Sequence, residues 1–326
     1  MNDESNGLRT RAMRDVFIEA LGHRMKEDEN IFFLCADFGS PALDRIRKEC
    51  PGRFINVGIA EQNLINVATG LALEGHTVYA YAIAPFITMR AYEQIRVNLA
   101  IQSQIKELNV NLIGVGAGLS YDVSGPTHHC VEDISIMRAL PGFVLFSPSD
   151  WVLASRFVDY SIRVKKPKYI RFEGKLSEQI YDDKEALRIE DGFCALRQGQ
   201  GVCFISTGFM TRTALKAAAA LGKNGISAGV IDLYLLKPIH GVRLFDAIKG
   251  YEAVITLEEG FVNKGGLDSA VSVLLEQNES KIKLKRMGIE DSYTFDMGTR
   301  DALHAMNGIG VGDVIAAVQG IFGNER

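Results

Sequence analysis

Short apolar runs alternate with segments of helical periodicity along the whole chain. Apolar side chains from Met13 to about Met25 recur at helical spacing, and the continuous apolar run 31–36 that follows is typical of a buried strand. Further strands are predicted at residues 54–57, 78–83, 110–115, 144–147, 169–172, 202–206, 227–233, 254–257 and 283–288. Helices are predicted at residues 42–50, 61–75, 89–101, 132–140, 151–164, 213–221, 267–275 and 314–322. This alternation indicates mostly parallel sheets covered on both faces.

A charged and polar stretch at residues 179–192 interrupts the alternation. The chain has 326 residues, which is longer than one hydrophobic core usually supports. We therefore predict an α/β fold of two domains, each a mostly parallel β-sheet flanked by helices, at residues 1–178 and 193–326. Residues 179–192 are the predicted linker, and Gly312-Asp313 are expected to cap the last helix.

Glu61 stands where a predicted strand gives way to a helix, in the segment Gly58-Ile59-Ala60-Glu61. Such strand-to-helix crossings are where open α/β sheets bind their ligands. The helix amino terminus favours an ionised carboxylate there, while burial favours the protonated form. A lone glutamate in a first helical turn is more often a solvated residue. The assignment of Glu61 therefore depends on the other residues of the site.

Charge and composition exclude several classes of function. The net charge is −4 and both signs are scattered along the chain, so no basic face for nucleic acid is expected. No apolar run approaches membrane-spanning length and the amino terminus is polar, so we expect no membrane association and a cytoplasmic location. The cysteine count is five, an odd number without a C-x-x-C pair, which indicates reduced thiols.

Two local motifs suggest chemistry that the sequence does not support further. The glycines of segment 114–118 resemble a dinucleotide loop, but no helix with a third phosphate-facing glycine follows, so a flexible loop over a site is preferred. His128 and His129 are adjacent, and consecutive side chains do not converge on one metal ion. We assign no metal ligands in this chain.

Three motifs in order carry a resemblance to a known family. They are Gly58-Ile59-Ala60-Glu61-Gln62-Asn63, then Phe86 followed by Arg90-Ala91-Tyr92-Glu93-Gln94-Ile95-Arg96, and then Gly125-Pro126-Thr127-His128. With these motifs the chain resembles the C-terminal half of a transketolase, which is a pyrimidine-binding domain followed by a small C-terminal domain. The segments 207–208 and 236–239 extend the resemblance into the second predicted domain.

The resemblance implies roles for residues around thiamine diphosphate. Glu61 would hydrogen-bond N1′ of the aminopyrimidine and promote the tautomer that activates the cofactor, which itself carries the carbon chemistry. Phe86 would stack on the pyrimidine ring, although without the resemblance a core role would be the more common one. Ile83 would line the same pocket, and Arg90 would either position the neighbouring loop or form a structural ion pair. His128 would face the substrate and bond its oxygen or relay a proton.

Substrate residues are implied less directly. Ser124 stands where the family has an aspartate that contacts a sugar hydroxyl. Lys175 follows the predicted strand 169–172 near the place where an arginine is expected as a phosphate anchor, and only arginine offers a rigid fork. Ser40, at the carboxyl end of the predicted strand 31–36, is assigned to the same substrate site. These departures lead us to expect an unusual sugar.

The chain contains no Gly-Asp-Gly motif, with which the family holds Mg²⁺ or Ca²⁺ against the cofactor diphosphate. The nearest string is Glu190-Asp191-Gly192, in the predicted linker. We therefore predict the C-terminal subunit of a split transketolase that transfers a two-carbon ketol unit from a ketose to an aldose. Its partner would be an N-terminal subunit with the diphosphate-binding domain and the metal, in an α2β2 heterotetramer with a homodimer of this chain at its core.

Other readings remain open. Within thiamine enzymes, the chain could resemble a deoxyxylulose phosphate synthase or the β subunit of a 2-oxoacid dehydrogenase, although the Pro-Thr-His string favours transketolase chemistry. A non-catalytic regulatory or scaffolding homologue is the alternative from another class. The joint presence of Glu61, Phe86 and His128 favours an enzyme. Glu258 and Glu259 are predicted to be an acidic pair at a strand end.

Overall fold

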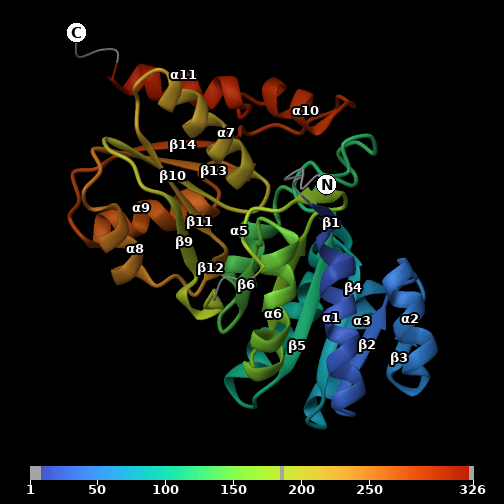
Figure 1. The fold of residues 1–326 in the computed structure, drawn as a ribbon. Coiled ribbons are helices and arrows are strands. Elements are labelled where there is room, and N and C mark those ends of the chain that lie inside the picture. The colour runs from blue at the N-terminus through green and yellow to red at the C-terminus, as the bar shows by residue number, and fades with distance from the viewer. Residues whose placement is uncertain (1–8, 184–186, 323–326) are drawn as a thin grey trace, which may run out of the picture.

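The computed structural model describes residues 9–183 and 187–322, which form two α/β domains (Figure 1). The larger sheet has seven strands in the order β12-β6-β7-β5-β4-β2-β3. Its six strands from the N-terminal domain are mutually parallel. They are β2 (Ile31–Cys35), β3 (Phe54–Asn56), β4 (Thr77–Ile83), β5 (Asn109–Val115), β6 (Val144–Phe146) and β7 (Lys168–Phe172).

Helices cover both faces of this sheet. One face packs against α1 (Met13–Glu27), α2 (Pro41–Glu49) and α6 (Trp151–Arg163), which share a core with its alternate strand residues. The other face packs against α3 (Glu61–Leu73), α5 (Asp133–Ala139) and the helical segment 86–104. That segment comprises a π-helix (Phe86–Arg90), α4 (Tyr92–Gln94), a second π-helix (Ile95–Ile101) and a 3-10 turn (Gln102–Gln104).

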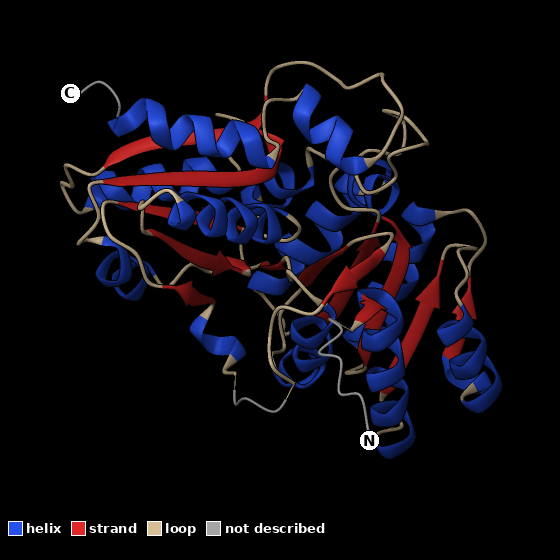
Figure 2. Ribbon diagram, turned by 45° about the horizontal axis from the view of Figure 1, so that its top comes forward, coloured by secondary structure: helices blue, strands red, loops and turns tan. Residues whose placement is uncertain are grey.

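The C-terminal domain contains a five-stranded sheet in the order β14-β13-β10-β11-β9. Its strands are β9 (Phe193–Arg197), β10 (Val202–Ser206), β11 (Ala228–Leu233), β13 (Ala253–Phe261) and β14 (Lys283–Ile289), and only β9 is antiparallel to its neighbour. The helices α7 (Met210–Lys223), α8 (Gly241–Ile248), α9 (Leu267–Gln277), α10 (Arg300–Met306) and α11 (Val311–Phe322) surround it. Figure 2 shows both sheets between helices.

Two strand pairs connect distant parts of the chain. The short strand β12 (Leu235–Lys237) leaves the C-terminal domain and pairs antiparallel with β6, so it completes the edge of the seven-stranded sheet. Near the amino terminus, β1 (Thr10–Ala12) pairs antiparallel with β8 (Leu176–Glu178). One cluster of buried apolar residues also includes side chains from both domains, among them Leu145 and Leu274. The two domains therefore share part of their core.

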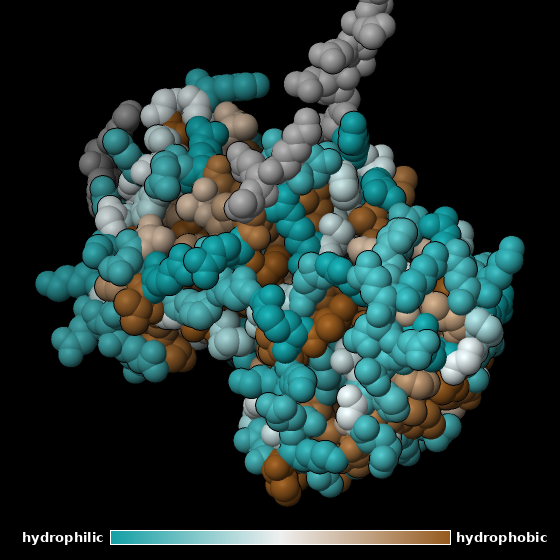
Figure 3. Space-filling model, turned by 60° about the horizontal axis from the view of Figure 1, so that its bottom comes forward, coloured by the Kyte–Doolittle hydropathy of each residue, from teal (hydrophilic) through white to brown (hydrophobic). Residues whose placement is uncertain are grey.

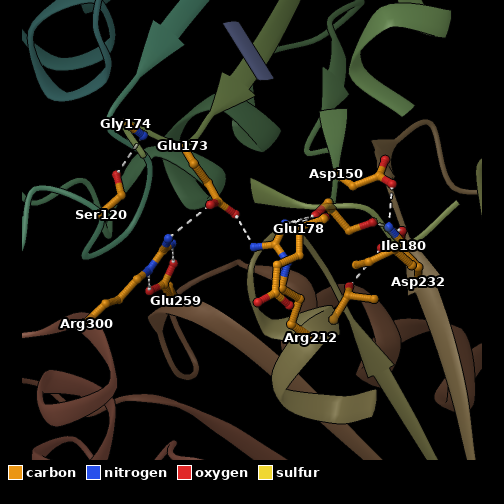
Figure 4. A network of polar contacts seen from close by, with 12 residues as sticks. Ser120, Asp150, Glu173, Gly174, Glu178, Ile180, Arg212, Asp232, Glu259 and Arg300 are labelled. Carbon is orange, nitrogen blue, oxygen red and sulfur yellow. Dashed lines mark hydrogen bonds and ion pairs between the residues drawn. The ribbon is translucent and has the colours of Figure 1, made fainter. Parts of the chain in front are cut away.

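Buried charges form a second connection between the domains (Figure 4). The carboxylate of Glu173, directly after β7, lies 3.3 Å from Nη1 of Arg300 and 3.5 Å from Nη1 of Arg212. Arg300 Nε also donates to Glu259 Oε1 at 2.7 Å, and His304 Nε2 lies 2.5 Å from the same oxygen. All five side chains are buried, so each charge depends on its partners rather than on water.

The observed fold confirms the predicted class of two mostly parallel sheets flanked by helices, and three details of the prediction are wrong. The helix expected from residue 89 begins earlier, at residues 84–85, which lead into the π-helix Phe86–Arg90, since the backbone of Pro85 suits the first turn of a helix. The last helix begins at Val311, so Gly312 and Asp313 lie inside its first turn. Asp313 Oδ2 instead accepts the N–H of Gly310 at 3.0 Å.

The third error concerns Glu258 and Glu259, which lie inside β13 and are buried. Successive side chains of a strand point to opposite faces, so the two carboxylates have different surroundings. Glu258 accepts the N–H groups of Leu267 and Asp268 at 3.0 Å each, and burial raises its pKa to about 7. Burial alone would also raise the pKa of Glu259, but Arg300 and His304 hold it well below its usual range.

The surface seen in Figure 3 intersperses hydrophilic side chains with smaller hydrophobic groups. Within residues 9–183 and 187–322, no helix is both long and apolar enough to cross a membrane. The same described residues contain no group of three or more His, Cys, Asp or Glu side chains placed to hold a metal ion. Residues 184–186 of the predicted linker lie outside the described residues.

Candidate active site

Glu61 is the first residue of α3, at the carboxyl end of the sheet, where the sequence predicted it. Gly58 has a φ of 75°, a left-handed conformation that glycine adopts without strain, and it turns the chain from β3 into the helix. Asn56 Oδ1 fixes this turn by accepting the N–H groups of Asp37 at 3.1 Å and Gly58 at 3.0 Å. The turn places the Glu61 side chain in the interior, where it is 5% exposed.

Phe86 and Arg90 reach the same place from the next crossing, after β4. Both belong to the π-helix that follows Pro85, in which Ile87 and Thr88 face the core. The guanidinium carbon of Arg90 lies 3.7 Å from the centre of the Phe86 ring. Its Nη1 donates to Glu61 Oε1 at 3.2 Å. π-Helical turns are rare and occur frequently at functional sites.

His128 reaches the site from the loop 117–131, which connects β5 to α5. Its ring meets the Phe86 ring edge to face, with centroids 5.3 Å apart. Its Nδ1 lies 3.0 Å from the hydroxyl oxygen of Thr127. Glu61, Arg90, Phe86 and His128 thus form one continuous series of contacts, built from three crossings at the same edge of the sheet.

The glycines at the start of this loop allow tight packing rather than flexibility. The φ angles of Gly116 and Gly118 are 97° and 58°, and a Cβ atom on Gly118 would lie 2.2 Å from a carboxylate oxygen of Glu259. Gly118 and Cys130 exchange two backbone hydrogen bonds of 2.9 Å, which close the base of the loop. The expected flexible loop is therefore tied down at its base, and these glycines are needed for close approach.

A pocket of about 420 Å³ opens beside these residues. The N-terminal domain contributes Pro85, Phe86, Met89, Arg90, Pro126, Thr127, His129 and Glu132 to its wall, and the C-terminal domain contributes Tyr293 and Phe295. Our reading of the sequence missed these two aromatic side chains. The sequence does contain a signal for them, which is two aromatic residues in a loop between a predicted strand and the chain end. In the structure Phe295 is 75% exposed.

His129 lines this pocket but is buried, with its Nε2 unpartnered within the described residues. Burial lowers its pKa, so the neutral ring is favoured. The two histidines have different surroundings, since the His128 ring meets Phe86 and the buried His129 makes no ring contact with it among the described residues. A shared metal ion between the two rings has no support in this geometry.

The predicted substrate residues lie at separate places. Lys175 Nζ lies 2.5 Å from Oδ2 of Asp122, a buried carboxylate six residues before His128. Ser124 is exposed in the same loop.

The other two predicted residues lie elsewhere. Ser40 is the N-cap of α2, and its hydroxyl accepts the N–H of Leu43 at 3.3 Å. Ile83 ends β4 beside Val115. Substrate contacts for Lys175, Ser124 and Ser40 stay predictions, and so does the place of Ile83 in the cofactor pocket.

Two family models match the chain, the pyrimidine-binding domain of transketolase at residues 9–178 and the transketolase C-terminal domain at residues 194–314. The chain belongs to the transketolase family. It is 32% identical to one of the subunits of the apulose-4-phosphate transketolase of Actinobacillus succinogenes, over 93% of this chain and 96% of that protein. It is 30% identical to a 6-deoxy-6-sulfo-D-fructose transketolase subunit of Clostridium sp., over 94% of this chain and 92% of that protein.

Solved structures show the same relationship. A structure described as a split gene transketolase in an inactive beta4 tetramer matches with a TM-score of 0.85 and 33% identity, over 97% of this chain and 99% of that one. The transketolase of Campylobacter jejuni matches with a TM-score of 0.79 at 17% identity, which shows the shared fold. This chain covers 96% of its own length there and 47% of that enzyme.

Proposed function

We propose that this chain is the C-terminal subunit of a split transketolase-like enzyme that transfers a two-carbon ketol unit with thiamine diphosphate. The observation that carries the proposal is the contact series of Glu61, Phe86 and His128 at one edge of the sheet. Relatives that match over almost their whole length are named as transketolase subunits or sections, which supports a division of the enzyme between two chains.

The residues of the site fit the aminopyrimidine of the cofactor. The Phe86 ring already carries a planar cation on its face, and the same cation donates to the buried Glu61 carboxylate. The aminopyrimidine is also planar, and its N1′ can share a proton with a carboxylate, so it could make the same two contacts with Phe86 and Glu61. When bound, thiamine diphosphate supplies the carbanion chemistry that ketol transfer requires. Glu61 would hold a proton at N1′, and Phe86 would orient the ring by stacking.

His128 is the proposed substrate-side residue. Its ring is partly exposed in the loop that faces the pocket, and one ring nitrogen is oriented by Thr127, so the other is free to serve a substrate oxygen. Positioned proton transfer of this kind contributes about 10²- to 10⁴-fold to a rate. Lys175, half-exposed beside Asp122, is the proposed contact for an anionic group on the sugar.

The partner in this proposal is a chain with the diphosphate-binding domain, which would also hold Mg²⁺ or Ca²⁺. An α2β2 assembly with a homodimer of this chain at its centre would place each Glu61 beside one diphosphate site. The names of two relatives point to a phosphorylated and a sulfonated ketose, so both belong in a screen of donors.

The test is co-expression with a candidate N-terminal subunit, followed by titration of thiamine diphosphate with Mg²⁺ in a calorimeter and a screen of ketose donors against aldose acceptors. We expect saturable cofactor binding by the complex and product formation that Glu61→Ala reduces by at least 10²-fold. Unchanged turnover in Glu61→Ala would instead support a scaffolding homologue. Tight cofactor binding and turnover by this chain alone would contradict the split arrangement.

A further inference from the structure

Arg90 makes both contacts that the proposed function gives to the cofactor pyrimidine. Its guanidinium carbon lies 3.7 Å from the centre of the Phe86 ring, and its Nη1 lies 3.2 Å from Glu61 Oε1. A guanidinium is planar, presents N–H donors at its edge and stacks on aromatic faces. The Arg90 guanidinium is therefore a planar hydrogen-bond donor that already contacts both the Phe86 ring face and the Glu61 carboxylate.

The two members of the Arg90–Glu61 pair differ greatly in exposure. The Glu61 side chain is 6% exposed, whereas the Arg90 side chain is 49% exposed. A buried carboxylate needs a hydrogen-bond or ionic partner, so Glu61 has to be satisfied whether or not a ligand is bound. The half-exposed guanidinium, in contrast, can return to water by rotation of its own side chain. The pair is thus suited to exchange of the arginine for another donor.

The backbone at Arg90 is anchored by buried neighbours, whereas its side chain is half exposed. Gln62 Nε2, from the first turn of α3, donates to the carbonyl oxygen of Arg90 at 3.1 Å. The neighbouring residues Ile87, Thr88 and Ala91 are buried, which anchors both sides of the turn. Phe86 and Arg90 are four residues apart in a helical turn and so lie on one face. Rotation of the arginine side chain is enough to uncover the part of the Phe86 ring that the guanidinium covers.

We propose that Arg90 is a displaceable placeholder for the aminopyrimidine, a proposal that rests on the proposed function. In the free subunit the guanidinium covers Phe86 and neutralises Glu61. It leaves when the pyrimidine enters. Because the guanidinium is tethered, its effective concentration at the site is high, and a free ligand has to compete with it. Binding of thiamine diphosphate then becomes favourable when a partner chain adds its own contacts to the diphosphate end of the cofactor.

The test uses the full-length chain alone and 4-amino-5-hydroxymethyl-2-methylpyrimidine as the probe, with binding followed by NMR of the probe signals. Arg90→Ala is expected to bind the probe at least ten-fold more tightly than the wild-type chain. The matched control is Arg96→Ala, which removes another exposed arginine of the same helical segment, paired with Glu93, and should bind as the wild type does. Added methylguanidinium should compete with the probe in Arg90→Ala. Arg90→Ser replaces this variant if it fails to fold.

The outcomes separate this proposal from the proposed function. Equal binding by wild type and Arg90→Ala would overturn the placeholder and leave the pyrimidine site standing. Probe binding that persists in Arg90→Ala combined with Glu61→Gln or Phe86→Ala would place the probe elsewhere and overturn both. Binding of methylguanidinium without the pyrimidine would contradict the proposed function, and failure of folded Arg90→Ala to bind either compound would overturn the placeholder.

Discussion

Glu173 of the N-terminal domain and Arg300 of the C-terminal domain form a buried ion pair, with 3.3 Å between Oε2 and Nη1 (Figure 4). Their side chains are only 4% and 7% exposed. Arg212 Nη1 lies 3.5 Å from the same carboxylate, so two arginines of the C-terminal domain share this one acid of the N-terminal domain. The relative position of the two domains therefore depends on charge as well as on apolar packing.

Glu173→Gln is expected to destabilise the fold, because it leaves two buried arginines with one carboxylate fewer. Removing one member of a buried pair typically lowers the free energy of unfolding by about 3–5 kcal/mol. Urea denaturation followed by circular dichroism measures the loss. Glu190→Gln is the matched control, since its exposed pair with Arg163 should contribute less than about 1 kcal/mol. Equal small effects for both variants would show that the interdomain pair does not stabilise the fold.

Glu258 should make the fold less stable as the pH rises from about 5 to 8. Burial raises its pKa in the folded chain to about 7, whereas the pKa of a glutamate in the unfolded chain lies near 4.5. Between these values the folded state binds more protons, so the free energy of unfolding falls as the pH rises. A shift of this size corresponds to roughly 3 kcal/mol.

Comparison with Glu258→Gln isolates this contribution, since glutamine does not titrate. The difference in the free energy of unfolding between the two proteins should change across pH 5–8 and level off above it. Asp232, whose pKa burial raises to about 6, contributes equally to both proteins and cancels. A difference that stays constant with pH would show that Glu258 remains ionised in the fold.

His128→Ala should lower kcat of the reconstituted enzyme by about 10²- to 10⁴-fold, because the variant removes the proposed proton donor and acceptor at the substrate. Steady-state kinetics with the best donor and acceptor measure the effect. His23→Ala, on the exposed face of α1, is the control and should keep full activity. If His128→Ala changed only the thermal stability, the histidine would be a packing residue against Phe86.

Phe295→Ser should weaken cofactor binding while leaving the fold intact. Phe295 is 75% exposed yet lines the pocket beside Phe86, so little core packing is lost. Each loss of about 1 kcal/mol of apolar contact weakens binding roughly five-fold, and we expect a change of this order in the dissociation constant of thiamine diphosphate. Calorimetry on the assembled complex checks this. Met306→Ser removes a 62% exposed side chain on α10 and should leave the affinity unchanged.

The order of strands and helices was predictable because burial sets the apolar period of each element. The position of Glu61 followed from the same pattern, since an apolar strand, a glycine and a helix start define the crossing. The roles of Phe86 and His128 came from the family resemblance, and the contacts between them support that assignment.

The contacts that the sequence did not reveal join residues far apart in the chain. Phe295 meets the pocket of Phe86 only because the C-terminal domain packs beside it. Arg90 stacks on Phe86 within a π-helical turn, a form of helix that no apolar period indicates. The adjacent acids Glu258 and Glu259 were predicted to lie at a strand end, because sequence polarity does not reveal that two buried carboxylates point to opposite faces of one strand.

The strand β12 means that the two family domains cannot be separated by cutting the chain between them. It belongs by sequence to the C-terminal domain, yet it covers the outer edge of β6. A fragment ending near residue 192 would expose the unpaired backbone of β6, and open strand edges promote aggregation. Recombinant fragments of the pyrimidine-binding half alone are therefore expected to be insoluble, and any rearrangement of the gene that joins this half to another domain would have to supply a substitute strand.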